Sequence, residues 1–524
     1  MMYDYIIVGA GSAGCVLASR LTEDPNITVL LLEAGTPDSK IEIHIPAAYS
    51  KLFKTKYDWN YYTEPQLHMH DRRLYIPRGK VIGGCSSING MIYIRGHSYD
   101  YDYWSKLGNQ GWSFREVLPY FKKAENRQQG TSEYYGINGL LNVANPRYTN
   151  PLSQAFVEAA VEVGIPRSQD LNYPEPEGVG IYQVNQKNGQ RCSSAVAYLK
   201  MCRHRANLTI LTSAQVTRVL FEANRAIGVE YIQGGKVTCQ AKARQEVILC
   251  GGAINSPQLL MLSGIGSANH LKDLGITVIA DLPGVGQNLQ DHLIVGAIYD
   301  CTQPISLDKA ETLGNLLKYL FWKQGPLASN IAEAGGFVKL NPDSKTPDLQ
   351  LHFAPVYFRN HGLNKREGYA FTLGGTLLHP QSSGHICLRS ADPLTPPSIQ
   401  PNFLSSEADL QTLIACVKLS RQIAQAKAFD QFRGEEILPR VEVKQDEEMA
   451  VYVRNIAETL YHPVGTCKMG NDPMAVVNSR LQVHGLQGLR VVDASIMPKI
   501  ISGNTNAPTI MIAEKIASLL VSKT

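Results

Sequence analysis

The chain has 524 residues, of which 44% are hydrophobic and 18% are charged, and it carries a net charge of +4 at pH 7. This length is enough for two or three domains, and the composition is that of a globular protein. The small positive charge is not gathered into a basic block, which argues against nucleic acid as a partner. No apolar run reaches the ~18 residues of a membrane span, so we expect no integral membrane segment.

The ten cysteines are scattered and form neither a CxxC pair nor a cluster with metal-ligand spacing. We therefore expect reduced thiols and no metal site, which is typical of a cytoplasmic protein. A first strand that begins at Tyr3 leaves no room for a signal peptide, and this supports the same compartment. Peripheral contact with a membrane stays open, although the sequence pattern indicates no amphipathic anchor.

The first 35 residues have the pattern strand, glycine-rich turn, helix, strand. An apolar run at residues 5–8 leads directly into GAGSAG at residues 9–14, and helical apolar spacing follows. A second apolar run at residues 28–32 ends on Glu33. Together these features predict a Rossmann-like dinucleotide-binding unit, whereas a GxGxxG motif alone is also found in turns that bind no ligand.

Each position of this motif has a physical reason. Gly9 permits the tight turn, Gly11 lets backbone N–H groups approach a pyrophosphate, and Gly14 lets the helix lie close to the strand. The N-terminus of the helix favours the negative phosphates. Glu33 follows Gly14 by 19 positions and can accept hydrogen bonds from a ribose. The motif does not distinguish FAD from NAD.

A second glycine-rich segment, PRGKVIGGCSSINGMIYIRG at residues 77–96, is suited to backbone that passes close to a flat ligand. Together with residues 9–14 and Glu33, it resembles the glucose–methanol–choline (GMC) family of FAD oxidoreductases. Some members of that family attach FAD covalently through a histidine in this segment. Ile88 stands at the corresponding position here, and we therefore predict that FAD is bound without a covalent link.

The resemblance extends over nearly the whole chain and implies an α/β (α+β composite) fold. This fold has a Rossmann-like FAD-binding domain and an interleaved substrate domain built on an antiparallel sheet. The predicted boundaries are 1–150 and 200–298 for the FAD-binding domain and 151–199 and 299–455 for the substrate domain. Residues 456–524 are predicted to return to the FAD-binding domain with the catalytic residues.

The resemblance also implies a set of cofactor-binding residues, which fall in four parts of the chain. They are Gly9, Gly11, Ser12, Ala13, Gly14, Glu33 and Ala34 near the N-terminus; Arg78, Gly83, Gly84, Ser87, Asn89, Gly90, Met91 and Ile92 in the second segment; Val216 and Gly251 in the middle; and Asp493, Ala494, Asn506, Pro508 and Thr509 near the C-terminus.

Several elements outside these motifs are also predicted. The apolar residues 247–250 form a strand, and a helix follows with Ser256 as N-cap and Pro257 at its first position. A last helix spans residues 510–520 and is opened by Thr509. Strand patterns at residues 350–353, 370–373 and 385–388 are typical of an antiparallel sheet. His292 and Glu333 are predicted to be structural.

The catalytic prediction rests on His462 in the motif HPVGT. The family places its active-site base at such a histidine and a partner His or Asn about forty residues later, which is here assigned to Asn506. A histidine can accept the hydroxyl proton of an alcohol near neutral pH. Asn506 can donate to the developing alkoxide, and the carbon-bound hydride then passes to flavin N5.

The predicted activity is therefore FAD-dependent oxidation of an alcohol to the aldehyde, with a primary alcohol preferred and choline possible as substrate. The electron acceptor is left open between oxygen and a quinone-like carrier. Two alternatives on the same fold are a hydroxynitrile lyase, which needs no flavin redox step, and a light-driven fatty acid decarboxylase.

Overall fold

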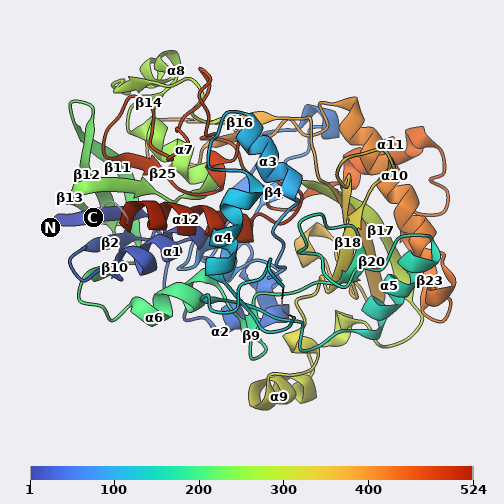
Figure 1. The fold of residues 1–524 in the computed structure, drawn as a ribbon. Coiled ribbons are helices and arrows are strands. Elements are labelled where there is room, and N and C mark those ends of the chain that lie inside the picture. The colour runs from blue at the N-terminus through green and yellow to red at the C-terminus, as the bar shows by residue number, and fades with distance from the viewer. Residues whose placement is uncertain (1, 131, 522–524) are drawn as a thin grey trace.

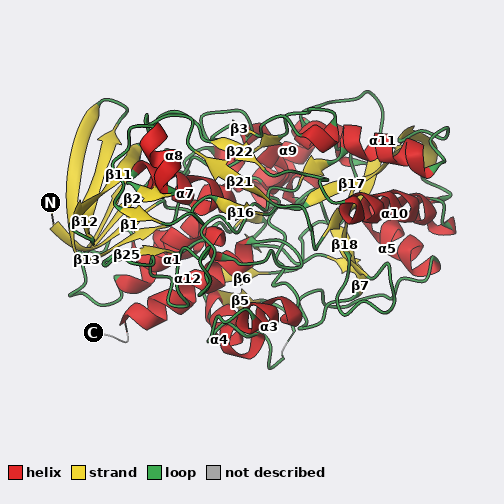
Figure 2. Cartoon of the chain, turned by 90° about the horizontal axis from the view of Figure 1, so that it is seen from above, coloured by secondary structure: helices red, strands yellow, loops and turns green. Residues whose placement is uncertain are grey.

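Two seven-stranded sheets, one toward each end of the molecule, form the frame of the fold (Figures 1 and 2). The structure is a computed structural model that describes residues 2–130 and 132–521. Both termini of the described chain lie beside the first sheet (Figure 1). The predicted α/β composite fold is confirmed.

The first sheet contains the predicted dinucleotide-binding unit. Its strand order is β10-β2-β1-β13-β12-β11, with β25 also paired to β13. Hairpin turns at residues 222–224 and 234–235 join the last three strands. The parallel strands are β1 Met2–Val8, β2 Val29–Leu32, β10 Leu208–Leu211, β13 Val237–Leu249 and β25 Leu489–Val491, and the antiparallel ones are β11 Ala214–Glu222 and β12 Arg225–Gln233.

Helix α1, Ser12–Leu21, leaves the glycine-rich turn and packs against α12, Asn506–Val521. The two helices start from opposite ends of the sequence but lie side by side along the first sheet (Figure 1). The last helix was expected to begin near residue 510, and the structure begins it four residues earlier. Pro508 and Thr509 therefore lie in the first turn of the helix. N–H groups in this turn have no acceptor within the helix, so a proline here costs no hydrogen bond.

Helix α7, Gly252–Leu262, also begins earlier than predicted. Its first N–H group, at Gly252, donates to the Asp493 carboxylate at 2.8 Å, so a distant acid replaces the expected Ser256 cap. Pro257 therefore lies inside the helix and leaves the carbonyl of Ala253 without its usual donor. The hydroxyl of Thr466 donates to that carbonyl at 2.6 Å, which compensates for the proline.

The second sheet is antiparallel, with the order β23-β17-β20-β19-β18-β7 and β24 paired to β17. The predicted boundary at residues 298/299 falls inside β17, which is one continuous strand of this sheet. The expected strand at residues 385–388 lies instead in a small separate sheet. The strands of the second sheet are β7 Gly178–Ile181, β17 Leu293–Cys301, β18 Ala334–Val338, β19 Leu349–Ala354, β20 Ala370–Leu377, β23 Arg433–Leu438 and β24 Glu458–Thr459, and the small sheet contains β16 Gln287–Leu289, β21 Gly384–Cys387 and β22 Ser398–Gln400.

One face of the second sheet is covered by helices and the other faces a large cavity. Stacked aromatic rings pack on the covered face. The ring centroids of Phe371 and Phe429 are 4.8 Å apart, and those of Phe353 and Phe156 are 4.9 Å apart. The covering helices are α5 Pro151–Glu162, α10 Glu407–Ala424 and α11 Asp446–Ile456 (Figure 2).

The remaining elements connect the two sheets. Helix α4 begins with a capping box, in which Glu116 accepts from the Ser113 backbone at 3.0 Å. These elements are α2 Ile41–His44, β3 Tyr61–Tyr62, β4 Tyr75–Ile76, α3 Ser98–Lys106, α4 Phe114–Ala124, β5 Glu125–Arg127, β6 Leu141–Val143, β8 Gln186–Lys187, β9 Gln190–Arg191, α6 Lys200–Cys202, β14 Ile265–Gly266, α8 Ala268–Asp273, β15 Ala280–Asp281 and α9 Leu313–Trp322.

The composition-based predictions can be compared with the described part of the chain. All ten cysteines are free. Within residues 2–130 and 132–521, no helix is both long and apolar enough to cross a bilayer.

Candidate active site

A cavity of about 650 Å³ lies between the two sheets. One end touches the carboxyl ends of the parallel strands, at Val8, Leu32 and Leu249, which is where ligands bind in sheets of this kind. The other end reaches the face of the second sheet, at β17 and β20. The cavity therefore connects the predicted dinucleotide site with the predicted catalytic histidine.

The dinucleotide end is shaped by backbone in close approach. A Cβ atom at Gly14 would lie 1.9 Å from the Gly9 carbonyl oxygen, and one at Gly9 would lie 2.6 Å from the Cys250 carbonyl oxygen. No side chain in the described part of the chain caps the N-terminus of α1, so its first N–H groups remain for a ligand. Glu33 accepts from the backbone of Ala10 at 2.9 Å, and burial raises its pKa to about 7.

The second glycine-rich segment passes across this turn. Gly83 donates its N–H to the Ala10 carbonyl at 2.7 Å, and a Cβ atom at Gly84 would lie 2.7 Å from the Cα atom of Gly11. The segment then continues along the cavity, where the Asn89 side-chain oxygen accepts from Arg191 at 2.8 Å. Its glycines are therefore required by contact between two stretches of backbone, as well as by any ligand.

Most of the predicted cofactor-binding residues line the cavity, and four do not. Gly14, Gly83, Ser87 and Pro508 lie behind its wall, where Ser87 donates to the Ile82 carbonyl at 2.7 Å. The predicted residues that line it are Gly9, Gly11, Ser12, Ala13, Glu33, Ala34, Arg78, Gly84, Asn89, Gly90, Met91, Ile92, Val216, Gly251, Asp493, Ala494, Asn506 and Thr509.

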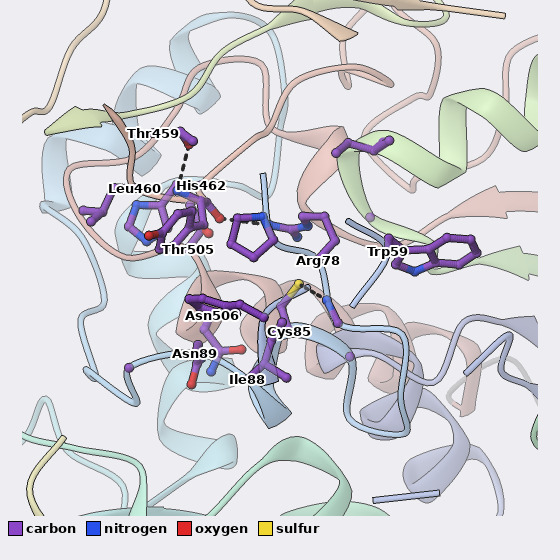
Figure 3. Close-up of a pocket in the computed structure, with 18 of the residues that line it drawn as sticks. Trp59, Arg78, Cys85, Ile88, Asn89, Thr459, Leu460, His462, Thr505 and Asn506 are labelled. Atoms are coloured by element: carbon purple, nitrogen blue, oxygen red, sulfur yellow. Dashed lines mark hydrogen bonds between the residues drawn. The ribbon is translucent and has the colours of Figure 1, made fainter. Parts of the chain in front are cut away.

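His462 lines the cavity and is held by hydrogen bonds on both its backbone and its ring. Its N–H donates to the Asp291 carboxylate at 2.8 Å, and its ring atom Nδ1 lies 3.0 Å from Nδ1 of His292. Figure 3 shows the ring beside Leu460 and Thr505, with Asn89 and Ile88 on the other side of the space.

The hydrogen-bond network assigns the proton on His462. Nε2 of His292 lies 3.2 Å from the Leu378 carbonyl, which can only accept, so this Nε2 carries a proton. Nδ1 of neutral His292 is then an acceptor, and Nδ1 of His462 must be the donor. Nε2 of His462 is left without a proton, which is the state a general base needs.

Burial favours the neutral form of both rings. Burial, followed by electrostatic repulsion that protonated His292 would exert, holds the pKa of His462 well below its ordinary value. Burial is also the main cause that lowers the pKa of His292 to about 3. Asp291, which orients both backbones, is also buried, and its pKa is raised to about 6.

The asparagine that contacts His462 differs from the predicted partner, Asn506, whose catalytic role stays a prediction. Asn504, and not Asn506, lies at the ring, with its Nδ2 at 3.3 Å from Nε2 of His462. The side-chain oxygen of Asn504 accepts from Gln350 at 3.0 Å, which directs its NH₂ group toward the histidine. Asn506 opens α12 and its Oδ1 accepts from Ser12 at 2.7 Å, so it joins the N-termini of α12 and α1.

Sequence reasoning therefore missed Asn504 and the contact made by His292. The segment GNTN offers two asparagines two positions apart, and only the start of α12 separates them. His292 was predicted to be structural, and its side chain is indeed fully buried, but its partner is the candidate base. A neighbour 170 positions away leaves no signal in a single sequence.

Glu333 lies outside the cavity, as its structural interpretation predicted. Its carboxylate accepts from the hydroxyls of Ser153 and Ser329 and from the backbone N–H of Asn150 at 2.7 Å. These bonds join α5, β18 and the loop before β18.

The second-sheet end of the cavity is apolar with three charged groups. Glu458 is the one carboxylate that lines this end among the described residues, and two guanidinium groups, of Arg72 and Arg359, line it as well. Both arginines act against the rise in the pKa of Glu458 that burial causes. The apolar lining comes from Tyr49, Phe53, Ile294, Ile298, Ile331, Phe358, Leu373, Leu438 and Tyr452.

Comparison with known proteins identifies the class. The sequence matches the GMC oxidoreductase family over residues 3–294 and 380–513. The chain therefore belongs to the GMC oxidoreductase family, as its glycine-rich segments and the HPVGT motif predicted.

Individual relatives match over nearly the full length. An alcohol dehydrogenase (acceptor) of Pseudomonas putida is 48% identical over 100% of this chain and 96% of its own length. An oxygen-dependent choline dehydrogenase of Pseudomonas savastanoi pv. phaseolicola is 49% identical over 98% of this chain and 93% of its own.

Solved structures show the same fold. Pyridoxine 4-oxidase from Mesorbium loti superposes with a TM-score of 0.92 at 33% identity and 99% coverage of both chains. A formate oxidase variant from Aspergillus oryzae, studied for FAD modification, gives a TM-score of 0.94 at 27% identity, with 100% of this chain and 98% of the other covered. The predicted class, an FAD-dependent enzyme that oxidises alcohols, is confirmed.

The residues present fit FAD. The cavity begins at an uncapped helix N-terminus beside three closely packed glycines and continues past Asn89 to His462. Ile88 lines the cavity and its side chain offers no nucleophile, so non-covalent binding stays a prediction.

Proposed function

We propose that this chain oxidises neutral primary alcohols whose body is largely apolar, with His462 as the base and Asn504 as the donor to the alcohol oxygen. The observation that carries the proposal is the unprotonated Nε2 of His462 beside Nδ2 of Asn504, both facing the cavity. A hydroxyl placed there can donate to the histidine and accept from the amide.

The residues divide the chemistry between them. His462 removes the hydroxyl proton through Nε2, while His292 accepts from Nδ1–H and keeps the ring in the productive tautomer. Asn504 stabilises the negative charge that develops on the alcohol oxygen. Bound FAD would supply the acceptor for the hydride of the alcohol carbon. Glu33 and the N-terminus of α1 would hold the ribose and the pyrophosphate.

The charges at the second-sheet end support a neutral substrate. A quaternary ammonium group needs negative charge or open aromatic faces. Here one carboxylate, Glu458, is opposed by Arg72 and Arg359, so the local charge does not favour a cation. Ile294 and Ile298 of β17 add apolar surface that suits an alkyl or aryl body.

Choline is the second candidate because aromatic rings also line this end. Tyr49 and Phe53 lie edge to face at 5.9 Å, and Tyr461 meets Phe53 at 6.1 Å in the same arrangement. Several relatives, at 46–49% identity, are named choline dehydrogenases. The rings are engaged with one another, however, and the two arginines oppose a cation.

The first experiment is an anaerobic titration of the FAD-loaded enzyme with ethanol, hexanol, benzyl alcohol and choline, followed by its visible spectrum. We expect hexanol or benzyl alcohol to bleach the flavin band at much lower concentration than choline. Preferential bleaching by choline would contradict the substrate class. A band that no alcohol bleaches would contradict the reaction and favour the lyase or photodecarboxylase alternative. Admitting oxygen or a soluble quinone afterwards identifies the acceptor.

Matched variants test the residue roles. His462→Ala should keep FAD and lose about 10²- to 10⁴-fold in the rate of flavin reduction. Asn504→Ala should lose about 10²-fold, the scale of one donor to a developing oxyanion. Asn506→Ala is the comparison: it should lower FAD content and leave the reduction rate per bound flavin within a few-fold. A larger rate loss in Asn506→Ala than in Asn504→Ala would restore the assignment made from the sequence.

A further inference from the structure

Helix α9, Leu313–Trp322, projects from the body of the protein (Figure 1). Its apolar residues Leu313, Leu316, Leu317, Leu320 and Phe321 have the spacing i, i+3, i+4, i+7, i+8 of one helix face. That face normally points to a protein core, but here all five residues are exposed. Leu313 and Phe321 are each 73% exposed, and Trp322, at the end of the helix, is 63% exposed.

The opposite side of the helix is fixed to the protein. Tyr319 is the one fully buried residue of α9, and its hydroxyl lies 3.1 Å from the Gly189 carbonyl oxygen. It packs with Ile45, Leu327 and Ala328. The helix is therefore held at a defined orientation, with its apolar face turned outward.

Charge at the base of α9 is positive. Residues 312–332 contain Lys318 and Lys323 and no acidic residue. A Cβ atom at Gly189 would lie 3.0 Å from Cβ of Lys323 and 3.2 Å from Cδ of Arg147, so both residues flank the β8–β9 hairpin, in which Lys187 is exposed. The acid that precedes the segment, Glu311, is paired with Lys51 at 2.8 Å.

We propose that α9 docks the enzyme on an anionic lipid surface, with its leucines, Phe321 and Trp322 inserted among the headgroups and the surrounding cations against lipid phosphates. An exposed apolar face with a terminal tryptophan and a basic surround is the pattern of a helix that lies in a membrane interface. The sequence pattern was expected to contain no amphipathic anchor, and the spacing of residues 313–321 is equally that of a helix face buried in the protein. Only the position of α9 shows that the face is uncovered.

Docking at α9 also bears on the cavity. The 3₁₀ turn Pro326–Ala328 contacts both α9 and the turn Pro46–Leu52, and Tyr49 of the latter lines the cavity. The docked helix is therefore connected to the cavity wall through these two turns.

The lipid-docking proposal does not depend on which alcohol is oxidised. Lipid binding is measured without turnover, so the two proposals can fail separately.

The test is flotation of the full-length, FAD-loaded protein with two kinds of vesicle, phosphatidylcholine alone and phosphatidylcholine mixed with phosphatidylglycerol. We expect binding to the mixed vesicles that weakens as salt rises. Trp322 should report insertion by a blue shift of its fluorescence, which Trp322→Phe abolishes while binding remains. Absence of binding to mixed vesicles at low salt would overturn the proposal.

Variants locate the contact. Phe321→Ser with Trp322→Ser should weaken binding to mixed vesicles by at least about tenfold, and Lys318→Glu by roughly tenfold. Leu67→Ser is the matched control, because Leu67 is 75% exposed on another segment, and it should bind normally. Equal losses in the control would overturn the assignment to α9.

A second copy of the chain is the competing occupant. Light scattering of the lipid-free protein should show the same mass for the wild type and for the Phe321→Ser, Trp322→Ser variant. A wild-type dimer that becomes a monomer in this variant would overturn the lipid assignment in favour of self-association.

Discussion

At His462 the chemistry depends on which ring nitrogen carries the proton. The carbonyl of Leu378 requires a proton on Nε2 of His292, and this requirement passes through Nδ1 of His292 to Nδ1 of His462. Nε2 of His462 therefore faces Asn504 as an acceptor. His292 acts through His462 and is a positioning residue.

The hydrogen bonds from Leu378 through His292 to His462 lead to a prediction for His292. His292→Leu removes the acceptor for Nδ1–H of His462 and should lower kcat by about 10- to 100-fold, the cost of a buried donor without a partner, with a smaller change in KM. His292→Asn retains an acceptor near the position of Nδ1 and should recover much of the loss. Steady-state kinetics across pH, with flavin content and Tm measured alongside, provide the test. If His292→Leu has the flavin content, Tm and kcat of the wild type, the hydrogen bond between His292 and His462 has no part in catalysis.

Asn504 and Asn506 show how local geometry separates similar residues. The two side chains are two positions apart, but α12 begins at Asn506. The side chain before the helix reaches the base, and the side chain in the first turn reaches α1. A motif can therefore identify the segment, while the start of a helix decides which of its side chains contacts His462.

At the scale of elements, the cofactor end depends on how closely α1 approaches β1. Gly14 lies in the first turn of α1, against the Gly9 carbonyl, and it is required for packing although it does not line the cavity. This agrees with the role expected for the third glycine of GxGxxG.

We therefore expect Gly14→Ala to displace α1 from the turn. The added methyl would lie 1.9 Å from the Gly9 carbonyl oxygen, so the backbone must shift, and FAD affinity should fall at least about tenfold. The ratio of flavin to protein after purification measures this effect. Gly314→Ala, in α9, is the control because its added methyl would meet no other part of the described structure within 4 Å beyond its own helix backbone, and its flavin content should match the wild type. A Gly14→Ala protein with full flavin content would contradict the packing role.

At the scale of the whole molecule, the space between the two sheets buries several histidines in neutral form. Burial lowers the pKa of His292 to about 3 and that of His352 and His361 to about 4 each. In the unfolded chain these groups titrate near ~6.5. Below that pH the unfolded state binds more protons than the folded state, so stability is lost as pH falls from about 6.5 toward 4.

The expected outcome is a steep fall in Tm on acidification. Each such histidine should remove about 1.4 kcal/mol from the free energy of unfolding per pH unit within this window. His352→Phe removes one of these groups and should therefore reduce the slope of stability against pH by about one proton. The change breaks no hydrogen bond at Nε2, which has no partner in the described structure. His204→Phe, at an exposed histidine, should leave the slope unchanged. Thermal unfolding of the FAD-loaded proteins at pH 7, 6 and 5 measures both, and equal slopes in all three proteins would exclude burial of His352 as a cause.

Local sequence patterns by themselves determine much of this protein. The apolar run, glycines and acid of residues 5–33 specify a strand, a turn and a helix whose contacts are close in sequence, and they are found as predicted. The GMC segments likewise determine the family and its cofactor. These features are local because a tight turn or a helix N-terminus is made by neighbouring residues.

Tertiary structure alone decided the rest, because the deciding contacts join residues far apart in the chain. Asp493 sets the start of α7 from 241 positions away, and His292 sets the tautomer of His462 from 170 positions away. The exposure of α9 is of the same kind: its period predicts a buried face, and only the absence of a covering element among the described residues turns that face toward solvent. The spacing of apolar residues in the sequence predicts which of them share one face of a helix. The tertiary structure determines whether that face contacts the protein or solvent.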